Sequence, residues 1–113
     1  MNARPQTLGE EIANSVSHGA GLVAAIAGAP VLIVAAAHSS AASIVGAAVF
    51  AATMILLYLA SSLYHALPAG RAKRVFLKLD HGSIYLFIAG SYTPFTLGAR
   101  GGAWGWTLFG VVW

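Results

Sequence analysis

The stretch GAGLVAAIAGAPVLIVAAA, residues 19–37, decides the fold, because it runs for 19 residues without a charged side chain. A helix needs about 20 apolar residues to cross the hydrocarbon core of a bilayer, so this stretch is long enough to span a membrane. Polar residues before it extend the predicted helix back to about Glu10, with the span itself over residues 13–37. Pro30 lies inside the span. Neighbouring helices can satisfy the carbonyl that a proline frees, and we expect a kink there.

Three more apolar segments follow towards the C-terminus. Residues 41–64 and 80–97 predict a second and a third span, and a fourth segment covers residues 103–113. That last segment is too short to cross a bilayer as a helix, so we expect a chain truncated inside its fourth span. The alternative is a short interfacial helix anchored by its tryptophans, at positions 104, 106 and 113. The predicted fold is all-α: a polytopic transmembrane helix bundle with three complete spans and a truncated fourth.

The composition agrees with a membrane protein. Hydrophobic residues make up 58% of the chain and charged residues only 8%, whereas soluble domains carry about 25% charged residues. A disordered chain is excluded as well, because disorder requires low hydrophobicity. There is no cysteine, so any metal would be held by His, Asp, Glu or hydroxyl oxygen.

The basic residues set the expected orientation. Cytoplasmic loops of membrane proteins carry an excess of Lys and Arg. If the first two spans both cross, the N-terminal tail and the second connection share one side, which carries Arg4, Arg71, Lys73, Arg74 and Lys78. The other side carries only Arg100. We therefore expect a cytoplasmic N-terminus in the inner membrane, and the clustered basic residues indicate topology rather than binding to nucleic acid.

A polar stripe precedes the first apolar run. Glu11, Asn14 and His18 are spaced i, i+3, i+7, which places them on one face of a helix, while Glu10 points elsewhere. This spacing has two interpretations. The stripe faces a buried or water-filled cavity, or it is an ordinary interfacial helix start with acidic residues near the N-terminus.

A second polar group lies where the second and third predicted spans meet the cytoplasmic side. Ser61 and His65 are four residues apart on one helical face, and Asp80 precedes the third span. An imidazole and a carboxylate there can contribute to a metal site, with the serine hydroxyl supporting the histidine. The alternatives are a hydrated interfacial histidine and an aspartate that caps a helix. One His and one Asp make only half of a catalytic metal site, which needs three protein ligands.

Three motifs carry a family resemblance. They are EEIANSVSHG at residues 10–19, SSLYHAL at 61–67 and KLDHGSIYLFIAGSYTPF at 78–95. In this order and on the expected helices they resemble the bacterial hemolysin III family, which belongs with the adiponectin and progestin receptors in a superfamily of seven-span proteins. The resemblance covers the chain from about Glu10 onward.

The resemblance implies a zinc site. His65 matches a ligand on the second span, Ser61 matches the serine of the Ser-x-x-x-His motif, and Asp80 matches an aspartate placed near the water of the metal. The two remaining ligands of the family come from a His-x-x-x-His motif on the last span, and this chain contains no such motif. The partners that complete the site would be the missing C-terminal spans. Glu11, Asn14 and His18 match a further motif and are not expected to be metal ligands.

The implied activity is that of a zinc-dependent hydrolase acting on lipid amides, with Asp80 and Ser61 as catalytic residues, or a role in membrane homeostasis. Two alternatives stay open. The protein is a non-catalytic hemolysin that perturbs membranes and causes cytolysis, or a receptor-like protein in which zinc is structural. In every case the expected partners include membrane lipids.

Overall fold

The computed structural model describes residues 4–113, and this part of the chain contains helices and no strand. The elements are α1 (Leu8–Ala37), α2 (Ala41–Ala66), α3 (Arg71–Thr93), the π-helix η1 (Pro94–Arg100) and α4 (Gly102–Val112). The all-α prediction is confirmed. Helix α1 ends and α2 begins at the residues where the predicted spans do, and the other boundaries differ.

The largest shift is at the start of α3. The third span was expected from Asp80, but the helix begins nine residues earlier at Arg71, with Gly70 as its N-cap. Asp80 therefore lies inside α3, and its interpretation as a helix cap is wrong. The first turns of α3 are basic, and hydropathy marks where a helix becomes apolar and not where it begins. Hydropathy therefore does not predict this start.

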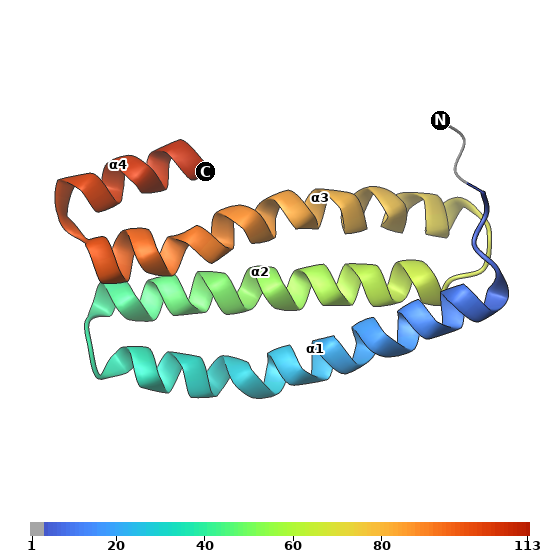
Figure 1. Ribbon diagram of the computed structural model, residues 1–113, viewed down its shortest axis with the longest axis horizontal. Helices are drawn as coiled ribbons and strands as arrows, with labels where there is room; N and C mark the ends of the chain where they lie inside the picture. The colour runs from blue at the N-terminus through green and yellow to red at the C-terminus, as the bar shows by residue number, and fades with distance from the viewer. Residues whose placement is uncertain (1–3) are drawn as a thin grey trace.

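A capping box fixes the start of α1 at Leu8, ahead of the predicted Glu10. The Thr7 side chain accepts a hydrogen bond from the Glu10 backbone N–H at 3.3 Å, and the Glu10 carboxylate accepts one from the Thr7 N–H at 2.7 Å. These bonds satisfy backbone donors that a helix N-terminus leaves unpaired. Helix α1 then runs through Pro30 to Ala37, and Figure 1 shows it bending between its blue and cyan parts.

The helices form a flat row with α2 in the middle. Helices α1 and α3 both run antiparallel to α2 and pack on either side of it, and α4 turns back beside α3 (Figure 1). The molecule measures 48 × 30 × 19 Å. Helices α1 and α2 are each long and apolar enough to cross a membrane. The third crossing, through α3 and η1, stays a prediction.

Small residues occupy the contacts between the helices, and large apolar residues point outward. The most buried apolar residues include Ala25, Ala47, Ala51 and Ala60, whereas Val31 and Val111 are at least 70% exposed. Without a hydrophobic effect between helices in lipid, close backbone packing through small residues is the usual driving force. This distribution is typical of a helical membrane bundle and atypical of a soluble core.

Candidate functional site

The polar stripe of α1 packs against the C-terminal half of α2. Because the helices are antiparallel, residues further along α1 meet residues earlier in α2. The contacts, in order along α1, are Glu11 with His65 at 2.9 Å, Ser15 with the Ser62 carbonyl at 3.3 Å, and His18 with Ser61 at 2.5 Å. Glu11 and His18 of the stripe therefore contact the neighbouring helix α2, and their role exceeds that of a hydrated helix start.

The pair of Glu11 and His65 is the most buried charged contact of the site. The exposed fraction is 8% for the His65 side chain and 16% for that of Glu11. An ionised carboxylate only accepts hydrogen bonds, so the Nδ1–H of His65 donates to Oε2 of Glu11. This contact fixes the imidazole tautomer and leaves Nε2 with its lone pair whenever the ring is neutral.

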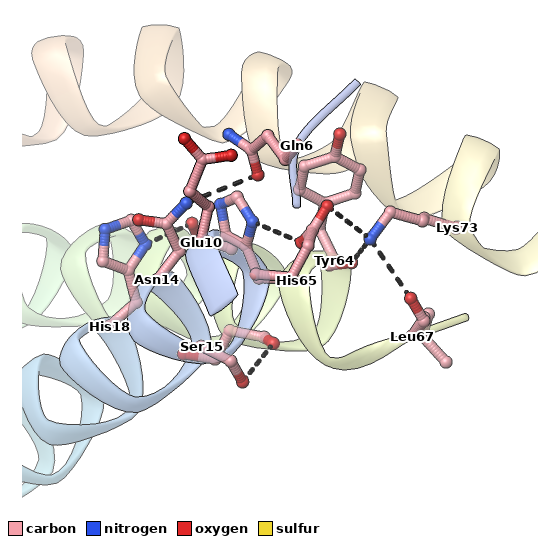
Figure 2. Close-up of polar contacts among 12 residues, drawn as sticks. Gln6, Glu10, Asn14, Ser15, His18, Tyr64, His65, Leu67 and Lys73 are labelled. Carbon is pink, nitrogen blue, oxygen red and sulfur yellow. Dashed lines mark hydrogen bonds and ion pairs between the residues drawn. The ribbon is translucent and has the colours of Figure 1, made fainter. Parts of the chain in front are cut away.

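Lys73 of α3 joins the same carboxylate from the other side. Its Nζ lies 3.0 Å from Oε1 of Glu11 and donates to the carbonyls of Tyr64 and Leu67 at 3.0 and 3.1 Å. It also lies 4.7 Å from the centre of the Tyr64 ring. The ammonium thus has a partner for each of its three N–H groups, and it offsets the negative end of α2. Figure 2 shows these contacts as dashed lines, with Lys73 to the right of His65.

His18 lies deeper along α1 and supports His65 indirectly. Its ring centre is 5.6 Å from that of His65, and the two rings are nearly perpendicular. The buried hydroxyl of Ser61 holds the Nδ1 of His18. The spacing along α2 predicts that Ser61 supports His65, whereas in the structure the Ser61 hydroxyl contacts His18 across the interface.

A cavity of about 910 Å³ opens beside this network. Glu11, His65 and Lys73 line its polar part, and Ile12 and Val16 are exposed apolar residues on its α1 wall. The cavity therefore has polar residues next to an apolar wall, and this wall suits a hydrocarbon tail. Such a cavity can admit a molecule with a polar group at one end and a hydrocarbon tail.

The structure does not unite every predicted site residue. Asn14 donates to the side chain of Gln6 at 3.4 Å and, within residues 4–113, forms no hydrogen bond with His65. Asp80 is half-buried, does not line the cavity, and within residues 4–113 its carboxylate forms no hydrogen bond or ion pair. At about 1.5 Å per residue it lies some 13 Å along α3 from Arg71, deeper than Lys73.

The donor set fits one part of a zinc site. His65 has the oriented imidazole that zinc ligands normally have, with its other nitrogen bound to a carboxylate. Across residues 4–113, however, no three His, Asp or Glu side chains gather closely enough to hold a metal ion.

Sequence reasoning missed Lys73, which completes the network. From the sequence alone, Lys73 is one of several basic residues that indicate orientation. A signal was available in its position three residues after Gly70, in the first turn of α3. A lysine there can reach the C-terminal carbonyls of the preceding antiparallel helix, which attract cations.

Comparisons with known proteins agree with the motifs. The family described as "Haemolysin-III related" matches residues 6–113. The chain is 41% identical to Hemolysin-3 of Bacillus cereus over 114 residues, covering 100% of this chain and 52% of that protein. It is 44% identical to the Hemolysin-3 homolog of Bacillus subtilis (strain 168) over 108 residues, covering 95% of this chain and 51% of the relative.

The chain therefore spans about half the length of the relatives it matches. No solved structure matches it.

Proposed function

This chain belongs to the haemolysin-III related family of membrane proteins, and on that premise we propose that it carries the His65 side of a zinc site in a membrane hydrolase acting on lipid amides. The proposal includes a cytoplasmic location for this site in the inner membrane, because the basic residues gather at the same end of the bundle. A role in membrane homeostasis would follow from such turnover of lipids.

The observation that carries the proposal is the hydrogen bond from Nδ1–H of His65 to Glu11. Carboxylate partners of this kind orient metal-ligating histidines and raise their basicity. Here the partner is nearly buried and is itself held by Lys73. The arrangement would position Nε2 of His65 for a metal without any movement of the helices.

A zinc ion in such a site supplies Lewis-acid chemistry that polarises a carbonyl and lowers the pKa of water. The chain's own residues would do the rest. Glu11 holds His65, and Ser61 holds His18 beside it. Asp80, carried over from the resemblance, would accept a proton from water. The apolar wall of the cavity at Ile12 and Val16 would receive the hydrocarbon part of a lipid amide.

Zinc content and lipid turnover of the purified full-length protein test the proposal. His65→Ala should lower bound zinc at least tenfold and abolish fatty-acid release from a long-chain N-acyl lipid. Glu11→Gln should weaken zinc binding by about 10- to 100-fold, as loss of such a partner does. His38→Ala is the matched control, because His38 is exposed at the end of α1 and should leave both readouts unchanged.

Unchanged zinc and unchanged turnover in His65→Ala would refute the proposal. Leakage of liposomes caused by the protein in the presence of a chelator would instead favour a non-catalytic, membrane-perturbing hemolysin. A chelator that lowers the unfolding temperature, in a protein with no lipid turnover, would favour the receptor-like alternative with structural zinc.

A further inference from the structure

A second hollow lies between α2 and α3 and shares no residue with the cavity at His65. It is a groove of about 390 Å³. Leucines form its walls, with Leu56, Leu59 and Leu63 on α2 and Leu79 and Leu86 on α3. Lys78 is the charged residue among those that line it.

Small residues create this groove. Gly82 lies along it, and a Cβ atom built there would meet nothing within 4 Å. Ala60 and Ser83 are buried beneath it. The leucines therefore flank the groove on both sides, and a side chain of ordinary size in place of these small residues would have filled the space between the helices.

A row of basic residues leads into the groove from the end of the bundle. Arg71, Arg74 and Lys78 are spaced i, i+3, i+7, which places them on one face of α3, and all three are exposed. Lys73, in contrast, forms an ion pair with Glu11. In the described part of the chain, residues 4–113, the structure forms no ion pair at the three residues of this row.

The acidic residues of the chain do not neutralise the row. There are three of them. Glu10 pairs with Arg4, and Glu11 pairs with His65 and Lys73. The third, Asp80, is on α3 itself and does not line the groove. The row therefore offers positive charge to a partner outside the chain.

The length of the groove matches one leaflet of a bilayer. It runs along α3 from Phe76 to Leu86, which is about 15 Å at 1.5 Å per residue. The hydrocarbon core of a bilayer is about 30 Å thick, so the groove is about as long as one leaflet is deep. The row of basic residues lies at the end where the headgroups would be.

We propose that this groove binds an anionic phospholipid, with an acyl chain between the leucines of α2 and α3 and the phosphate at Arg71, Arg74 and Lys78. Basic sites between membrane helices select anionic headgroups in this way. An apolar helix in the groove would cover the leucines and leave the row without counter-charge, whereas this lipid satisfies both. The site is independent of the proposed hydrolase chemistry.

The experiment measures lipid retention by native mass spectrometry of the full-length protein in neutral detergent, with added phosphatidylglycerol or phosphatidylcholine. Phosphatidylglycerol should be retained more strongly. The double variant Arg74→Gln, Lys78→Gln should bind it about 25-fold more weakly, since each basic residue near an anionic surface contributes about fivefold. Arg4→Gln is the charge control, because Arg4 is already paired with Glu10 outside the groove, and it should bind as the wild type does.

Gly82→Leu tests the groove without changing the charge. The new side chain should fill the groove and lower phosphatidylglycerol retention at least tenfold, and leucine is a better helix former than glycine, so the helix is retained. Gly28→Leu on α1 is its matched control, since a Cβ there also meets nothing within 4 Å. Equal retention of both lipids, or wild-type retention in the double variant and in Gly82→Leu, would overturn the proposal. Cross-links that place another helix of the protein in the groove would overturn it too.

Discussion

The two ends of the helix bundle are held together in different ways. The polar end, with Glu11, His65 and Lys73, joins the helices through long side chains. The small-residue end, with Gly46 on α2 and Pro94 on η1, joins them through their backbones, because a Cβ at Gly46 would lie 2.8 Å from the Cα of Pro94. Figure 1 shows η1 drawing close to α2 at this end.

The difference explains where the molecule has room for chemistry. Backbones that touch leave no space for a ligand. Side chains that bridge helices do leave space, and the cavity of about 910 Å³ lies beside Glu11, His65 and Lys73. The groove of about 390 Å³ also lies away from Gly46, along the later part of α2. The small-residue end therefore sets the architecture, and the polar end can bind partners.

Removing the carboxylate of Glu11 is the largest expected disruption of the polar end. Glu11→Ala leaves Lys73 nearly buried without its counter-charge, and breaking such a pair costs about 3 kcal/mol in the free energy of unfolding. Unfolding of the detergent-solubilised protein would measure it. Glu11→Gln keeps the volume and should cost less. Equal stability of Glu11→Ala and wild type would mean that the polar end does not hold the helices.

Adding one methyl group to the small-residue end should be the next largest effect. Gly46→Ala forces α2 and η1 apart, because its Cβ would also lie 3.3 Å from the carbonyl oxygen of Thr93. Overpacking of this kind costs about 2 kcal/mol. Thermal unfolding of Gly46→Ala beside Gly28→Ala checks it, since the control adds its methyl in open space. If the two variants unfold at the same temperature, backbone contact does not set the architecture.

The hydrogen bond between Ser61 and His18 should contribute less. Ser61→Ala removes a part-buried contact of 2.5 Å, and loss of such a bond costs about 1 kcal/mol. Because the two residues act as a pair, the effects of Ser61→Ala and His18→Ala should not add in the double variant. Strict additivity would show that the contact contributes nothing of its own.

The ion pair of Arg4 and Glu10 should have the smallest effect. The hydrogen bond to Glu10 raises the pKa of Arg4 above its ordinary value, but both side chains are solvent-accessible. Exposed pairs of this kind contribute little. Arg4→Gln should therefore leave the unfolding temperature unchanged, in contrast to Glu11→Gln, which alters the residue directly after Glu10 on α1. A clear loss of stability would show that the N-terminal tail also helps to hold the polar end together.

The sequence predicted the fold class and the residues of interest because both follow from local patterns. Long uncharged runs identified α1 and α2, and the scarcity of charge made Glu11 and His65 conspicuous. It did not predict the basic turns of α3 that begin at Arg71, since hydropathy marks only the apolar part of a helix. It also paired Ser61 with His65, because spacing within one helix says nothing of the helix across the interface.

The sequence by itself determined that this chain is a helical membrane protein of the haemolysin-III related family. That information is carried by composition and by motifs that need no coordinates. Only the tertiary structure decided which polar residues meet: Glu11 with His65 and Lys73, and His18 with Ser61. The physical reason is that α1 and α3 both pack antiparallel to α2, which brings Glu11 and Lys73, 62 positions apart in the sequence, to the same end of the bundle. The helix register then sets the individual contacts.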